Sequence, residues 1–403
     1  MNWKKIFRKV HLWLSIPTGI IITLICFSGA MLVFEKECNE WLTPKRYFVK
    51  ESKGQVIPLD ELMEQVAETL PDSTHITGVT VFADSTRTYQ VSLSKSRRAS
   101  IYVNPYTGEV VGRSERLPFF NTMFRLHRWL LGSSSNEHGI AWGKLLTGIS
   151  TLVLVVVLIT GILMWLTNRK KPLKASLCIH VTKGWRRFWH DLHVAGGIYA
   201  TLFLLAMALT GLTWSFSWYR TGFYACLGVH SSAEDGGHGK ETSGGEGRHG
   251  GRGGEGRHGG EGFHEGHEGL GGEGFHEGHG WHRSPYRHWD EVLHEVAQQN
   301  PSYRQITLKS EMAEVVPAGR LSMRATDKYS FNRRSGEITD VKPYSSESRD
   351  TKVRSCVYMV HTGSWGGLCT RILYFIAAFL GATLPLTGYW LWIRRLRNKH
   401  QHH

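Results

Sequence analysis

Residues 10–34 read VHLWLSIPTGIIITLICFSGAMLVF, a run that contains no Asp, Glu, Lys or Arg. A helix needs about 20 apolar residues to cross the hydrocarbon core of a bilayer, so this run predicts a membrane span. Three further uncharged apolar runs lie at residues 145–168, 192–219 and 372–393. The mean hydropathy of −0.25 conceals these runs because it averages them with polar segments. We therefore predict a membrane protein with four transmembrane helices and exclude a soluble enzyme.

The net charge of +14 is concentrated beside the predicted spans. Lys and Arg cluster in residues 1–9, 169–189 and 394–403, and these three segments contain no acidic residue. Basic segments next to spans remain in the cytoplasm, so both termini and the middle loop are predicted to be cytoplasmic. The charge needs no nucleic-acid partner to explain it.

The second half of the chain repeats the first. His11 and Gly29 in the first span are 18 residues apart, as are His193 and Gly211 in the third. Three further segments match, each given before its counterpart: Asp60-Glu61-Leu62 and Asp290-Glu291-Val292, Asn104 to Val110 and Asn332 to Ile338, Thr160-Gly161 and Thr387-Gly388. The sequence therefore predicts a tandem duplication of a unit composed of a span, an external domain and a span.

Each external domain is predicted to be a small α+β unit. An amphipathic helical pattern at 59–70, and again at 288–299, is followed by a proline that cannot continue it. In the first unit, alternating runs at 77–82, 88–93 and 100–103 favour half-buried antiparallel strands. Gly108 and Gly336 follow Thr and Ser in predicted hairpin turns, where glycine supplies a positive φ.

A Gly/His-rich insert at residues 230–282 interrupts the second unit. Its composition cannot bury a core, which predicts disorder. Its Gly-x-Gly-x-x-Gly matches have no strand before them and no helix after them, so they do not indicate a dinucleotide site. Histidines of the insert are candidates for weak metal binding, although a solvated linker fits equally well: His249, His258, His264, His267, His276 and His279.

Four histidines lie at the ends of the predicted spans. His11 and His193 open the first and third spans on the cytoplasmic side, whereas His127 and His361 precede the second and fourth on the external side. Ionisable residues at such positions are costly and often functional, although a histidine that reaches the interface is the simpler alternative. Two neutral imidazoles from facing helices are the axial ligands that a low-spin haem iron accepts. His138 and His190 are possible substitutes.

Four glycines accompany these histidines. Eighteen residues of helix span about 27 Å, so Gly29 and Gly211 reach the external end, and Gly161 and Gly388 reach the cytoplasmic end. Their missing side chains could admit a flat macrocycle between the helices. Close helix packing is the alternative role for small residues. The chain has no Cys-x-x-Cys-His motif, so covalently attached haem is not predicted.

The spans, the Thr-Gly-x-x-x-Trp endings and the paired turns resemble the PepSY-domain transmembrane family. This family includes iron-uptake-associated inner-membrane proteins and ferric-siderophore reductases of Gram-negative bacteria. The resemblance covers nearly the whole chain except the insert. It implies four helices with PepSY-like domains in the periplasm, and two b-type haems held by His11, His193, His127 and His361. Electrons would then pass outward to ferric iron.

The predicted organisation follows from these patterns. It comprises a cytoplasmic N-terminus (1–9), spans at 10–34, 145–168, 190–219 and 368–393, periplasmic PepSY-like domains at 35–126 and 286–360, a periplasmic interfacial segment (127–144), a basic cytoplasmic loop (169–189), the insert (230–282) and a cytoplasmic tail (394–403).

The expected function is electron transfer across a bacterial inner membrane, with reduction of ferric siderophore or another Fe(III) chelate in the periplasm. No flavin or nicotinamide motif is visible, so the donor is expected to be a cytoplasmic reductase or a quinol. No catalytic residue is assigned. One alternative is a non-redox PepSY module that binds or inhibits a periplasmic partner. Another is a His-rich metal sensor or transporter. The transporter is disfavoured because the four apolar runs contain no Asp, Glu, Lys or Arg that could bind a cation.

Overall fold

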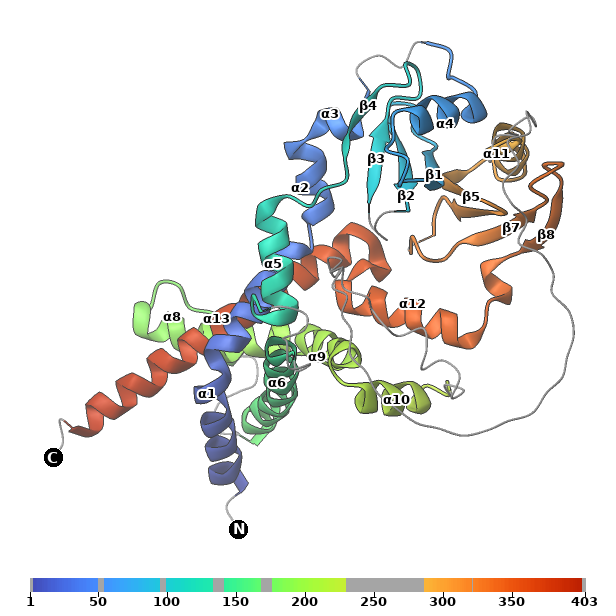
Figure 1. Ribbon diagram of the computed structural model, residues 1–403. Coiled ribbons are helices and arrows are strands. Elements are labelled where there is room, and N and C mark those ends of the chain that lie inside the picture. Colours follow the sequence, from blue (N-terminus) through green and yellow to red (C-terminus); the bar gives the residue numbers. More distant parts are fainter. Residues whose placement is uncertain are drawn as a thin grey trace, which may run out of the picture.

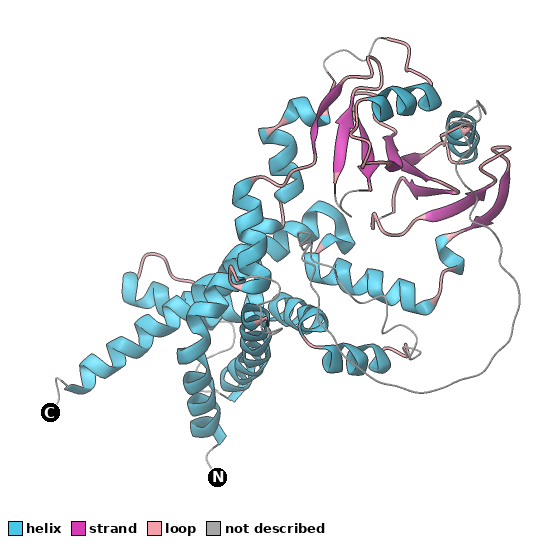
Figure 2. Cartoon of the chain, in the orientation of Figure 1, coloured by secondary structure: helices cyan, strands magenta, loops and turns pink. Residues whose placement is uncertain are grey.

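The structure is a computed structural model that describes residues 3–49, 54–94, 99–132, 141–167, 176–229, 286–320 and 322–400 (Figure 1). It combines a bundle of long helices with one β-sheet, which lies beside one end of the bundle (Figure 2). The insert at 230–282 and its proposed metal-binding histidines lie outside the described residues, as does His138.

In the described part of the chain, four helices are long and apolar enough to cross a membrane, which confirms the four predicted spans. They are α1 (Trp3–Leu32), α6 (Trp142–Thr167), α9 (Gly197–Ser215) with the α8 helix (Trp185–Asp191) and a π-helical turn (Leu192–Gly196) before it, and α13 (Gly367–His400). Both α1 and α13 extend beyond the predicted spans into Lys- and Arg-rich ends, because these residues are good helix formers.

The four spans pack side by side in a square arrangement. Both α1 and α9 contact α6 and α13, so α1 lies diagonally opposite α9. The centre of the bundle includes the small residues Cys26, Ala200 and Ala377, which let the helices approach closely. The Tyr389 hydroxyl on α13 donates a hydrogen bond to the Ile16 carbonyl on α1 at 2.6 Å, which joins these two neighbours.

The eight strands found among the described residues belong to one antiparallel sheet. They are β1 (Ile76–Phe82), β2 (Tyr89–Leu93), β3 (Ser100–Val103), β4 (Val110–Arg113), β5 (Tyr303–Lys309), β6 (Met312–Pro317), β7 (Asp327–Phe331) and β8 (Ile338–Lys342). Their order is β4-β3-β2-β1-β5-β6-β7-β8. The first four strands therefore occupy one half of the sheet and the last four the other.

The two halves join through β1 and β5. Val79 pairs with Leu308 and Thr80 with Thr307, and the two threonine hydroxyls lie 2.9 Å apart. The two small α+β units that the sequence predicts therefore share one continuous sheet. An unpaired edge strand exposes a row of backbone hydrogen-bonding groups, and each half covers such an edge of the other.

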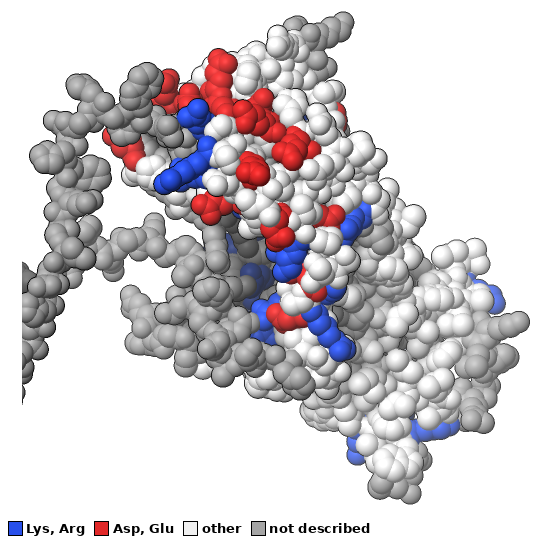
Figure 3. All heavy atoms as spheres, turned by 90° about the vertical axis from the view of Figure 1, so that its right-hand side faces the viewer, with Lys and Arg blue, Asp and Glu red and all other residues white. Residues whose placement is uncertain are grey.

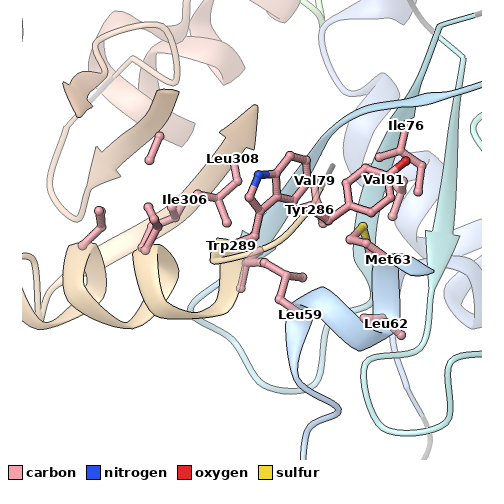
Figure 4. Packing of buried hydrophobic residues seen from close by; sticks show 14 of the residues in the cluster. Leu59, Leu62, Met63, Ile76, Val79, Val91, Tyr286, Trp289, Ile306 and Leu308 are labelled. Carbon is pink, nitrogen blue, oxygen red and sulfur yellow. The ribbon is translucent and has the colours of Figure 1, made fainter. Parts of the chain in front are cut away.

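One apolar core serves both halves of the sheet. The helices α4 (Leu59–Glu68) and α11 (Trp289–Gln299) cover the same face. Figure 4 shows Trp289 of the second half lying next to Leu59 of the first and Leu308 of the sheet. Trp289 is 2% exposed, and its ring centroid lies 5.2 Å from that of Tyr286. The largest buried side chain thus packs at the junction of the halves.

Two carboxylates tie α4 and α11 together at their N-termini. Asp60 on α4 accepts hydrogen bonds from the backbone N–H groups of His288 and Asp290, both at 2.9 Å. Asp290 on α11 accepts one from the N–H of Leu59, also at 2.9 Å. Burial raises the pKa of the Asp60 carboxyl, whereas these N–H groups act in the opposite direction. Each acid therefore satisfies the free N–H groups that begin the other helix.

Short elements connect the sheet to the bundle. They are α2 (Glu35–Leu42), α3 (Pro44–Tyr47), α5 (Pro118–Trp129), α10 (Ser217–Cys226), α12 (Arg349–Thr362) and two 3₁₀ turns at Tyr344–Ser346 and Ser364–Gly366. Gly108 and Gly336 have φ values of 73° and 74°, which confirms the positive φ predicted for the hairpin turns.

Charge is segregated between the two parts of the molecule. The helices α4 and α11 carry Asp and Glu but no Lys or Arg. In the view of Figure 3, acidic side chains gather on the upper part, and the lower part is mostly uncharged with Lys and Arg near its bottom edge. This distribution suits a bundle surrounded by lipid and a sheet in water.

The paired caps predict coupled stability. Asp60→Ala or Asp290→Ala should each lower the free energy of unfolding by about 0.5–2 kcal/mol, because each leaves N–H groups of the opposite helix unpaired. The double variant should lose less than the sum, since the two caps share one junction. Scanning calorimetry in detergent measures these changes. The exposed Glu64→Ala on α4 is the control and should change stability by less than about 0.5 kcal/mol. The prediction would be contradicted if both Asp variants had the same free energy of unfolding as the wild-type protein.

Candidate functional site

The four predicted histidines meet in two pairs at opposite ends of the bundle. His11 on α1 and His193 in the π-helical turn form the distal pair, at the end away from the sheet, with ring centroids 6.4 Å apart and ring planes at 87°. His127 on α5 and His361 on α12 form the proximal pair, next to the sheet, at 6.1 Å and 53°. Each pair is thus assembled from one histidine of each half of the chain.

The same hydrogen bond holds all four imidazoles. In each case Nδ1 lies within 3.2 Å of a backbone carbonyl on a neighbouring helix. The pairs of residues are His11 with Val157 (3.1 Å), His193 with Leu384 (3.2 Å), His127 with Ile25 (2.9 Å) and His361 with Met207 (3.0 Å). A carbonyl oxygen only accepts, so the proton is assigned to Nδ1 and the lone pair to Nε2. Among the described residues, no Nε2 atom of these histidines has a hydrogen-bond partner.

Three threonines add a second acceptor, a role that the sequence analysis missed. The Oγ1 atoms of Thr160, Thr387 and Thr210 lie 3.2, 2.9 and 3.2 Å from the Nδ1 atoms of the neighbouring histidines. Each hydroxyl donates its own proton to a carbonyl within its helix, so it accepts from Nδ1–H. The sequence signal was present, because a Ser or Thr precedes each of the four glycines. Before Gly29 this residue is Ser28, and its hydroxyl donates a hydrogen bond to the Leu24 carbonyl.

The four glycines make room for the imidazole rings. A Cβ atom placed on Gly29 would lie 2.9 Å from Cε1 of His127, and one on Gly211 would lie 3.0 Å from Cε1 of His361. The distances from Gly161 to His11 and from Gly388 to His193 are 3.5 and 3.4 Å. In the structure the edge of an imidazole faces each missing side chain, and the predicted accommodation of a macrocycle stays a prediction.

The spacing of the two ring centres in each pair fits a metal-centred group between them. An imidazole nitrogen binds a metal at about 2.0 Å and lies about 1.1 Å from its ring centre, so two opposed ligands have centres about 6.2 Å apart. The observed values of 6.4 and 6.1 Å match this spacing. The described residues contain no group of three or more His, Cys, Asp or Glu that could hold a metal ion. Two nitrogen donors are what haem iron needs beyond its macrocycle.

Burial favours the neutral form of both proximal imidazoles. Burial lowers the pKa of His361 to about 4, helped by the neighbouring His127, and burial also lowers the pKa of His127. A neutral imidazole is the form that binds a metal.

Two nearby side chains differ from the sequence expectation. The Trp214 ring lies edge-on to His361, with centroids 5.0 Å apart, a contact that the sequence analysis did not predict. The side chain of His190, considered as a substitute ligand, is 49% exposed, and its Nδ1 lies 3.4 Å from the Asp191 carboxylate. The distal pair is therefore formed by His11 and His193 themselves.

Comparison with known families accounts for nearly the whole chain. The family model of the PepSY-associated TM region matches residues 8–395, which include all four histidines and all four glycines. No curated protein matches the chain.

The glycine contacts predict different tolerance at the two ends of the bundle. Gly29→Ala should lower the free energy of unfolding by about 1–3 kcal/mol, because the new methyl group displaces the His127 ring from the Ile25 carbonyl. Thermal unfolding of the purified variant measures this loss. Gly161→Ala is the matched control, since its methyl group makes an ordinary contact with His11 and should leave stability unchanged or higher by about 0.4–1 kcal/mol. Equal effects at the two positions would refute the close fit at the proximal pair.

Proposed function

Because the chain belongs to the PepSY-associated transmembrane family, we propose that it is a two-haem electron conduit that reduces ferric iron outside the cytoplasm. One observation carries the proposal: two pairs of imidazoles lie at opposite ends of a membrane bundle, and in each ring Nδ1 is hydrogen-bonded while Nε2 has no partner among the described residues. A protein that needed these histidines only for packing would not require the same free nitrogen on all four.

The residues of each pair would hold one b-type haem. His11 and His193 are the proposed ligands at the distal site, and His127 and His361 at the proximal site. A bound haem supplies a one-electron couple at each end of the bundle. The carbonyl and threonine acceptors keep the proton on Nδ1 and fix the ring orientation, which is the usual role of groups that surround a metal ligand.

The proposed orientation of the bundle in the membrane follows from the positions of its Lys and Arg residues. The Lys- and Arg-rich ends of α1 and α13 lie beyond the apolar parts of these helices, which supports a cytoplasmic distal end in a bacterial inner membrane. The sheet, with its PepSY-like halves, would then lie in the periplasm. A tandem duplication accounts for the matching order of helix, strands and helices in the two halves.

The proposed substrate is Fe(III) in an oxygen-rich chelate such as a siderophore. Fe(II) has a lower charge density than Fe(III), so hard oxygen ligands release it more readily. Electrons would enter near the distal pair, from a cytoplasmic reductase or a quinol, and leave near the proximal pair.

Haem content tests the ligand assignment. We expect two non-covalent haems per chain in a pyridine haemochrome assay. His193→Ala and His361→Ala should each retain about one, because each removes a ligand from a different pair. His294→Ala changes a histidine whose side chain is 74% exposed on α11, and it should retain two. Haem-free wild-type protein would eliminate the redox proposal and favour a non-redox PepSY module that binds a partner.

The same two histidine variants test the direction of electron transfer. In reconstituted vesicles, His193→Ala should block reduction by a donor at the distal end but keep redox exchange between the proximal site and reagents on the sheet side. His361→Ala should accept electrons from the donor but fail to reduce a ferric chelate. Wild-type rates of ferric reduction in both variants would show that electrons do not follow this route.

A further inference from the structure

A second cluster of ionisable groups lies at the distal end of the bundle, around Asp191. Asp191 ends α8 and is 4% exposed. Its carboxylate accepts hydrogen bonds from Nδ1 of His180 and Nε of Arg187, both at 2.8 Å, and lies 3.4 Å from Nδ1 of His190. None of these groups is a proposed haem ligand.

The cluster fixes the tautomer of His180. An ionised carboxylate only accepts hydrogen bonds, so Nδ1 of His180 carries the proton and Nε2 carries a lone pair. Among the described residues, this Nε2 has no partner. The His180 side chain remains 28% exposed. A carboxylate that orients an imidazole in this way makes its other nitrogen a base that can take a proton from an approaching hydroxyl group.

The segment that carries His180 is held in place at its start. The Trp165 indole N–H on α6 donates to the Ser176 hydroxyl at 2.8 Å, and the Tyr199 hydroxyl on α9 donates to the Leu177 carbonyl at 2.9 Å. Together with the hydrogen bond between His180 and Asp191, these contacts tie the segment to α6, α9 and α8. His180 is thus presented by a fixed support, as a catalytic base requires.

Apolar side chains flank His180. Ile179 is 37% exposed and Val181 is 73% exposed, and they lie on either side of it in the chain. The cluster stands at the end of the apolar spans, where a bilayer meets water. A ligand that suits this position has a polar head with a hydroxyl group and an apolar body that remains in lipid.

The helix end does not need this carboxylate in order to form. The offset of 182 residues that relates His193 to His11 places Lys9 at the position of Asp191. In α1 that position is helical with a lysine. The acid therefore belongs to one half alone, unlike the four histidines and four glycines, which occur in both.

We propose that His180 and Asp191 form the site at which a lipid-soluble quinol is oxidised. This inference rests on the proposed function and assigns its electron donor. His180 is the catalytic residue and Asp191 the positioning residue. The quinol loses two electrons and two protons: one hydroxyl proton passes to Nε2 of His180, the other passes to water, and the two electrons pass one at a time to the distal site. The resulting quinone returns to the bilayer.

The position of Asp191 suits this transfer. Asp191 and His193 are two residues apart on one continuous helical segment, which places their side chains on roughly opposite sides of it. The quinol site would thus lie about one helix diameter, roughly 10 Å, from the distal pair.

Rapid mixing of the purified, haem-loaded protein with decylubiquinol tests the proposal. Unaltered protein should show haem reduction in the visible spectrum, and His180→Gln should slow it about 100-fold, as expected for loss of a general base. Asp191→Asn should also slow the reaction, because an amide no longer holds the proton on Nδ1 of His180. Haem content and reduction by dithionite should be unchanged in His180→Gln. Lys183→Gln, at an exposed position in the same segment, should react at the wild-type rate.

The outcomes separate the two proposals. Protein without haem would refute the electron-conduit function itself. Haem-loaded protein that dithionite reduces but decylubiquinol does not would overturn only the quinol site and leave a protein reductase as donor. A His180→Gln variant that quinol reduces at the wild-type rate would overturn the assigned base, even if Asp191→Asn loses haem.

Discussion

The hydrogen bond from an imidazole Nδ1–H to a carbonyl on the adjacent helix is the interaction on which the candidate site depends. In each case the accepting carbonyl lies four residues before a glycine, as Leu384 lies before Gly388. Without a side chain at that glycine, the ring can approach the backbone of the neighbouring helix. The bond thus requires close helix packing, and it also fixes the tautomer that leaves Nε2 free.

These hydrogen bonds join helices that also pack against one another. His11 links α1 to α6, and His193 links the turn before α9 to α13. The proximal histidines link α5 to α1 and α12 to α9. Because α1 and α9 are diagonal, their two histidines face one another across the bundle axis. The arrangement that packs the spans is therefore the same one that forms the distal pair.

The continuous sheet constrains the proximal pair. The chain enters α5 from β4 and α12 after β8, and these strands are the two edges of the sheet. The junction of β1 with β5, the shared core around Trp289 and the caps of Asp60 and Asp290 join the halves into one body. The sheet thereby holds the two helices that carry His127 and His361 at a set separation.

The sequence by itself determined the four spans, the hairpin glycines and the histidine and glycine positions, because hydrophobic length, positive φ and repeated spacing are local properties. Tertiary structure alone decided that the sheet is continuous, that Asp60 and Asp290 cap opposite helices, and that glycines face imidazoles. Each of these depends on residues at least 98 positions apart in the chain, such as Gly29 and His127 or Val79 and Leu308. No local pattern records which edge strand or carbonyl will lie opposite another, since that is settled only when the helices and strands pack.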